Sequence, residues 1–271
     1  MAGSQISSSF GALATSDEEC ALARAVIYNY LSIAYRYPTE AHHQALKELD
    51  EGLRESLYVL SDGADDPAAK WCSELTELAA SSSLEDLEAN HVILFSHSPH
   101  GTCPLYEGEY AESEEGLQQP HELGDLAAFY RAFGLEMADK SRQRVDFIAV
   151  ECEYLSFLCH KQAYAQEHED MNLAELSLDA QKKFLQDHLG RWAPAFARQV
   201  VRKADQGFYQ VLAHFTSAHV TADCQRLGVQ PRSNQLRVRL AEKPLDSCFN
   251  CPSAEDCADG SLFSPNESLE R

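Results

Sequence analysis

The sequence lacks the two features that would direct a chain into or across a membrane. It contains no run of about 18 consecutive apolar residues, which is the length that a membrane-spanning helix needs. Residues 1–16 also lack the basic start and the apolar stretch of a secretory signal. From these absences we expect a cytoplasmic protein without a membrane span.

Basic residues are scarce in this chain. It has 22 lysines and arginines against 43 aspartates and glutamates, which gives a formal net charge of −21. Nucleic-acid binding depends on a basic footprint that neutralises phosphates, so this balance argues against a nucleic-acid partner. An acidic surface favours basic partners and speeds their encounter, although acidity also serves simply to keep a protein soluble.

Strand patterns are lacking as well. No alternating segment of useful length occurs, whereas apolar residues follow helical spacing almost throughout the chain. Ser16 and Glu19 form a capping box ahead of a first helix, and Thr39 begins a second, leucine-rich helix that continues to Leu60. We therefore expect an all-α fold with a disordered N-terminus (1–15), one compact helical domain (16–227) and an irregular, cysteine-containing tail (228–271).

A long loop and the helix that follows it are the best candidates for a functional site. The loop, residues 97–120, is longer than most connections in compact domains, which usually marks function or mobility. The next helix, predicted over 143–167, has apolar rows on two sides and should be buried on both. An aromatic, proline-containing loop beside a helix with carboxylates suits the capture of a peptide. No nucleophile–base pair or phosphate-binding loop stands near it, which disfavours catalysis.

Five motifs along the chain follow one another in a recognisable order. They are Cys103-Pro104-Leu105-Tyr106-Glu107-x-x-Tyr110, Leu126-Ala127-x-Phe129-Tyr130-x-x-Phe133-Gly134-Leu135, Asp146-x-x-x-x-Glu151, His188-Leu189-x-x-Trp192-x-Pro194-x-Phe196 and Phe208-Tyr209-x-x-Leu212. With these motifs the sequence resembles the TorD/DmsD/NarJ family, the chaperones that mature molybdenum oxidoreductases. The loop and the cysteine tail look more like the subgroup that serves enzymes of the dimethyl sulfide dehydrogenase, selenate reductase and ethylbenzene dehydrogenase type.

The resemblance implies an all-α chaperone of the TorD-like type, without catalytic activity and without a required cofactor. Such a protein binds the twin-arginine leader or N-terminal region of the apo catalytic subunit of a molybdopterin oxidoreductase. It holds that subunit in the cytoplasm until the cofactor is inserted, and so delays export. Family members are monomers or dimers that exchange helices between protomers. The family's binding residues carry over to Pro104, Tyr106, Glu107, Tyr110 and Asp146, which with their neighbours Leu105, Phe147 and Glu151 form the predicted peptide-binding site.

The chemistry of these residues fits a basic leader. The carboxylates of Glu107 and Asp146 can take the guanidinium forks of arginines, and Tyr106 and Tyr110 offer ring faces for stacking. Structural roles remain open, because the tyrosines are also suited to a core and Asp146 to the N-terminal dipole of its own helix. Phe147 stands where the family has a histidine, so no titratable imidazole is expected there.

One motif is assigned to packing and not to binding. His188 and Trp192 lie one helical turn apart in the predicted helix, and tryptophan favours burial.

The nine cysteines form an odd number and, without a secretory signal, are typical of reduced thiols or metal ligands. Cys248, Cys251 and Cys257 are arranged as C-x2-C-x5-C, and thiolates at such spacing can hold a metal ion or an iron–sulfur cluster. A fourth ligand would have to be Cys224, Cys103 or a histidine. A metal-responsive or redox-responsive protein is therefore the alternative function, and free thiols in a flexible tail are the simpler interpretation.

A carboxylate-bridged di-metal enzyme is a further alternative. Two Glu-x-x-His pairs, Glu40 with His43 and Glu88 with His91, have the spacing that helix bundles of this class use. The two additional glutamates that such a site needs have no obvious bundle register, so this alternative is disfavoured.

Overall fold

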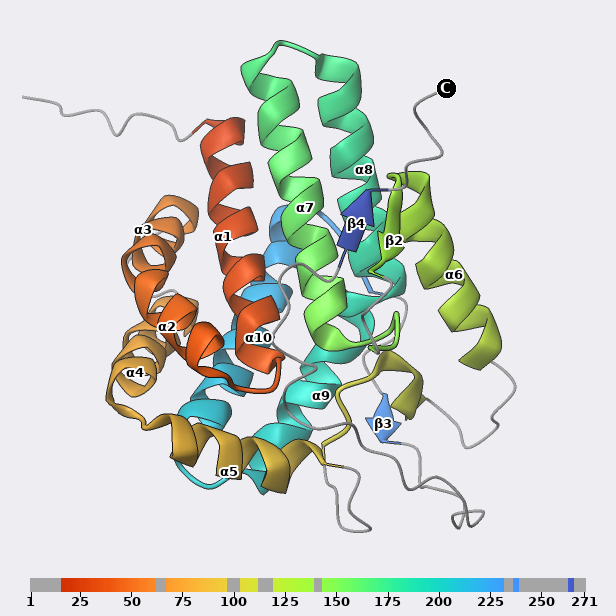
Figure 1. Cartoon of the computed structure of the whole chain (residues 1–271). Helices are drawn as coiled ribbons and strands as arrows, with labels where there is room; N and C mark the ends of the chain where they lie inside the picture. Colours follow the sequence, from red (N-terminus) through yellow and green to blue (C-terminus); the bar gives the residue numbers. More distant parts are fainter. Residues whose placement is uncertain are drawn as a thin grey trace, which may run out of the picture.

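Helix α7 (Ile148–Glu167) forms the middle of a helical assembly and packs most extensively against α1 (Asp17–Tyr35). Figure 1 shows the other helices arranged around this pair, with α8 antiparallel to α7 and α10 behind α1. This computed structural model describes residues 16–61, 67–96, 103–111, 119–138, 143–231, 236–238 and 263–265. Its remaining helices are α2 (Glu40–Glu48), α3 (Asp50–Leu60), α4 (Pro67–Ser81), α5 (Leu84–Phe95), α6 (Gln119–Ala132), α8 (Met171–Asp187), α9 (Leu189–Lys203) and α10 (Phe208–Arg226). The predicted all-α fold is confirmed.

The capping box predicted for α1 is present. The Glu19 amide donates to Ser16 Oγ at 3.1 Å, and the Ser16 amide donates back to Glu19 Oε2 at 2.8 Å. Both bonds satisfy N–H groups that a helix terminus leaves without intrahelical partners. The helix then buries Ile27 and Leu31 completely in the core.

The leucine-rich helix predicted from Thr39 to Leu60 is interrupted, which corrects the prediction. Leu49 ends α2 and precedes α3, with φ −84° and ψ −4°, outside regular helix geometry. Its amide still donates to Ala45 O and its carbonyl still accepts from Leu53, so the chain changes direction without losing these bonds. The bend lets both halves place their leucines in the core.

The central helix starts later than its apolar pattern predicts. Phe147 is its N-cap with extended dihedrals, and Asp146 lies in a turn ahead of the helix, which corrects the predicted start at residue 143. The backbone at the start of the helix forms hydrogen bonds with the preceding loop. The Glu107 amide donates to Asp146 O at 2.9 Å, and the Ile148 amide donates to Leu105 O at 2.9 Å. The predicted burial of α7 on two sides is confirmed, since Cys152, Leu155, Tyr154 and Leu158 are all fully buried.

Two pairs of very short strands join segments that are far apart in the sequence. β1 (Tyr110–Ala111) pairs antiparallel with β3 (Arg237–Val238), and β2 (Leu135–Met137) pairs antiparallel with β4 (Phe263–Pro265). Both β3 and β4 come from the region predicted as an irregular tail. Strands of two or three residues carry no periodicity, so the sequence gives no signal for them.

A buried ion pair ties α1 to α10. Arg24 donates to both oxygens of Asp223, from Nε at 2.6 Å and from its second terminal nitrogen at 2.9 Å, and Tyr28 donates to the same carboxylate at 2.7 Å. Burial alone would raise the pKa of Asp223, but the Arg24 guanidinium and the Tyr28 hydroxyl outweigh it and lower that pKa to about 2.

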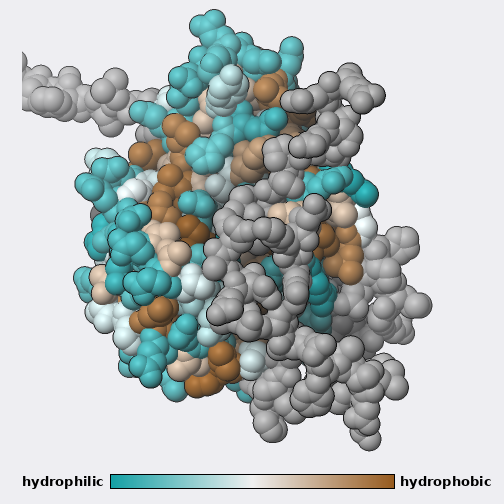
Figure 2. All heavy atoms as spheres, viewed as in Figure 1, coloured by the Kyte–Doolittle hydropathy of each residue, from teal (hydrophilic) through white to brown (hydrophobic). Residues whose placement is uncertain are grey.

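On the face shown in Figure 2, many of the coloured side chains are hydrophilic, and apolar side chains gather in a stripe over α1. Within the described ranges, no helix combines the length and the apolar character that crossing a membrane requires.

Candidate functional site

The described part of the long loop, residues 103–111, is fixed to the body by its backbone. Cys103 donates to Leu94 O at 3.2 Å, at the end of α5. Tyr106 forms an isolated antiparallel bridge with Phe147, and their rings lie 5.7 Å apart. The chain then turns through a 3-10 helix, η1 (Glu107–Glu109), into β1. Three buried carboxylates lie around this turn, and each has a different set of partners.

Asp146 fixes the turn through its buried side chain. Its side chain is 1% exposed and accepts both prongs of the Arg144 guanidinium, at 2.9 and 2.6 Å. It also accepts the Gly108 amide at 3.0 Å. The same guanidinium donates to Glu109 at 3.1 Å and lies 4.6 Å from the centre of the Tyr106 ring. Asp146 and Arg144 together therefore fix both the turn and the tyrosine beside it.

Glu107 connects the turn to α9. It is fully buried, and His188 Nδ1 lies 3.0 Å from one carboxylate oxygen while Arg191 donates to the other at 3.1 Å. The other ring nitrogen of His188 faces Asp125 of α6 at 3.5 Å, and Asp125 is 60% exposed. Glu107 and His188 thus link the buried turn to an acidic group at the surface.

Glu151 of α7 is the third carboxylate. Trp192 Nε1 lies 3.0 and 3.2 Å from its two oxygens, and the Tyr110 ring packs 5.2 Å from the Trp192 ring. Burial raises the pKa of Glu151 well above the ordinary glutamate value, the neighbouring Glu107 carboxylate raises it further, and the Trp192 hydrogen bond acts in the opposite direction. The folded protein therefore favours the neutral form of Glu151, and ionising this carboxyl group as the pH rises is unfavourable.

Glu151→Gln tests this conclusion. A carboxyl group whose pKa is raised by folding stabilises the folded state most at low pH. That contribution is lost as the pH rises above the pKa of the group in the unfolded chain, which is about 4.3. The wild type is therefore expected to lose more stability than the variant between pH 4.5 and 7.5, measured by urea unfolding. Glu167→Gln, at a 66% exposed position of the same helix, is the control and should leave the pH profile unchanged. Identical profiles for wild type and Glu151→Gln would contradict the raised pKa.

The structure brings the eight predicted peptide-binding residues together, but it buries most of them. Pro104 and Tyr106 are partly exposed, whereas the carboxylates have internal partners that would have to be displaced before they could bind a guanidinium. Their contact with a peptide stays a prediction. The members of the set are Pro104, Leu105, Tyr106, Glu107, Tyr110, Asp146, Phe147 and Glu151.

Residues of α9 complete the site in a way that sequence reasoning missed. His188 and Trp192 are buried, as their assignment to packing predicted, yet each also provides a polar partner to a carboxylate. A signal was available in the sequence, because Arg191 and Trp192 follow His188 by three and four residues and place further donors near it at the start of α9. Which carboxylates they reach depends on the tertiary structure.

The predicted metal ligands cannot be placed together. Cys248, Cys251 and Cys257 lie outside the described residues, and Cys103 and Cys224 are buried. Among the residues that the structure describes, no group of three potential ligands could hold a metal ion. Of the proposed di-metal pairs, His43 contacts Ala79 O at 3.0 Å and His91 lies among aromatic rings.

Comparison with known proteins gives consistent matches. The family model described as nitrate reductase delta subunit matches residues 46–198. The perchlorate reductase assembly chaperone protein of Dechloromonas aromatica is 29% identical over 76% of this chain and 90% of its own length. The chaperone protein TorD of Shewanella loihica is 27% identical over 76% of this chain and 93% of its own length. The selenate reductase assembly chaperone protein of Thauera selenatis is 29% identical over 71% of this chain and 99% of its own length.

Proposed function

Because the chain belongs to the nitrate reductase delta subunit family, we propose that it is an assembly chaperone for the apo catalytic subunit of a molybdopterin oxidoreductase. The observation that carries this function is the match, over 90% and 99% of their own lengths, to relatives named as assembly chaperones of perchlorate and selenate reductases. The family resemblance carried by the sequence motifs is confirmed. In this role the chain acts in the cytoplasm as a binding protein and not as an enzyme.

The proposed contact is the twin-arginine leader or N-terminal region of the client. Such a leader is basic, and a chain with a net charge of −21 attracts it over a distance of about one Debye length. A dissociation constant near micromolar, about −8 kcal/mol, would hold the leader and still release it once the cofactor is inserted. Retention of the leader during this interval would delay export.

The acidic rim of the site, which we define as Glu109 and Asp125, offers this leader its exposed carboxylates. Glu109 is 36% exposed and Asp125 is 60% exposed, in contrast to the buried carboxylates beneath them. Tyr106, partly exposed and held by Arg144, presents a ring next to Glu109. The buried carboxylates and their hydrogen-bond partners therefore support the function by positioning this rim.

Co-purification tests the function as a whole. The protein is used as bait in cytosol of its native host, grown where a molybdopterin oxidoreductase is expressed, and retained proteins are identified by mass spectrometry. We expect a catalytic subunit that still carries its leader. Absence of that subunit from the retained fraction, while it is detected in the input, would contradict the proposal.

The rim is tested by neutralising it. Glu109→Gln with Asp125→Asn is expected to weaken binding of the leader peptide by about tenfold and to reduce its dependence on salt, because two exposed carboxylates are removed. Titration calorimetry at two salt concentrations measures both effects. The control, Glu167→Gln with Asp179→Asn, changes the net charge equally at positions 66% and 67% exposed. Equal weakening by both pairs would show that only the overall charge matters.

A further inference from the structure

A pocket of about 260 Å³ lies between α5 and the turn that joins α9 to α10, with the end of α4 at one side. Figure 1 shows α5 at the lower edge of the molecule, where this turn also lies. The described lining falls within residues 78–94 and 203–209. The volume is below the range of about 300–1,000 Å³ that is usual for small-ligand sites, so the pocket suits a side chain of a partner better than a small molecule.

The floor of the pocket is apolar. Leu87, Leu94, Phe208 and Tyr209 line it, and each of them is at most 5% exposed. Ile93 lines it as well but is 68% exposed, so an apolar side chain stands in solvent beside an apolar floor. Such a surface is stabilised when a partner covers it.

Two carboxylates line the pocket from different elements. Asp86 belongs to the first turn of α5, and Asp205 belongs to the turn between α9 and α10. Ser83 Oγ donates to one oxygen of Asp86 at 2.6 Å, which leaves the other oxygen for a partner. Within the described ranges, the side chain of Asp205 has neither a hydrogen bond nor an ion pair. Asn90 uses its amide nitrogen to donate to Asp86 O at 2.8 Å, so its side-chain oxygen is a further acceptor.

Lys203 is the one basic residue among the described lining residues. It lies in the last turn of α9, where a cation interacts favourably with the helix dipole. Since the lining has two carboxylates against this single ammonium group, the balance of charge favours a cationic ligand.

We propose that this pocket binds a lysine or arginine side chain of the client, together with the apolar residue beside it, as a second anchor for the segment that meets the acidic rim. This inference rests on the proposed function. Lysine and arginine lay their aliphatic stems on apolar surface and keep the charged head among polar groups, which matches an apolar floor edged by acceptors. Hydrogen bonds between a cationic donor and a carboxylate are also among the stronger ones in proteins.

Ring contacts connect the floor of this pocket to the candidate site. The Tyr209 ring lies 5.3 Å from that of Phe95, Phe95 lies 6.2 Å from Phe196, and Phe196 lies 6.3 Å from Tyr110. An extended peptide advances by about 3.3 Å per residue, so one segment of the client is long enough to reach both places.

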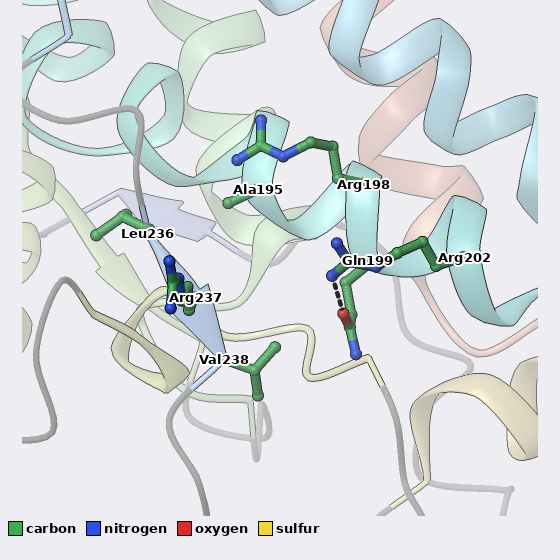
Figure 3. A pocket seen from close by; sticks show the side chains of 7 residues that line it. All are labelled: Ala195, Arg198, Gln199, Arg202, Leu236, Arg237 and Val238. Atoms are coloured by element: carbon green, nitrogen blue, oxygen red, sulfur yellow. Dashed lines mark hydrogen bonds between the residues drawn. The ribbon is translucent and has the colours of Figure 1, made fainter.

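The larger pocket in Figure 3, of about 480 Å³ between α9 and β3, is unsuited to the same side chain. Its described lining includes Arg198, Arg202 and Arg237 and no acidic residue. A lysine or arginine of the client would be repelled there, which leaves the pocket beside α5 as the better match.

Nuclear magnetic resonance of the full chain with two small probes tests the proposal. The probes are acetyl-arginyl-leucinamide and acetyl-glutamyl-leucinamide, and the reporters are the side-chain amide signals of Asn90 and Gln206, which line the pocket. We expect saturable shifts with the arginine probe and an affinity for the glutamate probe that is weaker by at least about tenfold. No saturable shift with the arginine probe, or equal affinities for the two, would overturn the proposal.

Variants locate the site. Asp86→Asn with Asp205→Asn is expected to weaken binding of the arginine probe by at least about tenfold, whereas Lys203→Gln should strengthen it by about threefold because a like charge is removed. All three residues are exposed, so the fold should be unaffected, which circular dichroism checks. Asp179→Asn, at a 67% exposed position of α8 outside the pocket, is the control and should bind as the wild type does. Unchanged binding in the aspartate variant, or no gain in Lys203→Gln, would contradict the assignment.

The aspartate variant also separates this inference from the proposed function. Used as bait in host cytosol, it should retain less of the client than the wild type does. Equal retention would overturn the second anchor and leave the proposed function standing. Retention of the client by neither protein, while the arginine probe binds the wild type, would contradict the proposed function and not the pocket.

Discussion

Replacing Asp223 by asparagine is expected to lower the free energy of unfolding by about 3–5 kcal/mol, because breaking a buried pair leaves an uncompensated charge. Arg24 and Asp223 are 2% and 0% exposed, so water cannot replace the carboxylate as the partner of Arg24 in the variant. Urea unfolding at neutral pH measures the loss. An effect below about 1 kcal/mol would show that the pair is not buried in solution.

The pH dependence of the same variant gives a second test. The pKa of Asp223 is lowered by folding to about 2, so its stabilisation is present above the unfolded value of about 3.9 and is lost as the pH falls through 2. The difference between wild type and Asp223→Asn should therefore shrink between pH 4 and pH 2.

Two control variants separate the charge from the position. Asp50→Asn removes an ion pair with Arg54 of equal length, 2.6 Å, but those side chains are 36% and 44% exposed, so we expect a loss below about 1 kcal/mol. Arg24→Met with Asp223→Leu removes both buried charges and is expected to cost less than Asp223→Asn alone. A larger cost for the double variant would mean that the hydrogen bonds of this network, and not its charges, dominate.

Replacing Glu107 by alanine is expected to destabilise the protein by about 3 kcal/mol or more and to release the loop. Glu107 is the acceptor for His188 and Arg191, and its removal leaves a cavity and buried donors without this acceptor. Urea unfolding reports the global effect. Hydrogen exchange at the amides of Glu107 and Ile148, which bond the loop to the start of α7, reports the local one.

The comparison variant is Glu109→Gln, two residues along the same turn. Glu109 is 36% exposed and accepts a hydrogen bond only at the surface from Arg144, so its loss should cost less than about 1 kcal/mol and leave the exchange rates unchanged. Retained amide protection in Glu107→Ala would mean that the backbone bonds hold the loop without the buried carboxylate.

Local patterns predicted most of the helical framework because they depend on neighbours in the chain. The capping box of α1 involves residues three apart, and the two apolar rows of α7 repeat every helical turn. The same reasoning failed at Leu49 and at residue 143. At Leu49, the spacing of the leucines does not reveal that the chain changes direction at a single residue. At residue 143, backbone bonds from the distant loop delay the helix by five residues.

The sequence by itself determined the helical class, the family and the eight predicted residues that the structure brings together, since spacing and motif order are properties of the chain alone. The tertiary structure decided which of those residues face solvent. Glu107 meets His188 across 81 residues, and Glu151 meets Trp192 across 41. A carboxylate in a sequence motif can bind a basic peptide, or it can accept a hydrogen bond from a donor inside the protein, and the sequence does not distinguish the two. Only the packing of α9 against η1 and α7 brings those donors within hydrogen-bond distance of Glu107 and Glu151 and gives these two carboxylates internal partners.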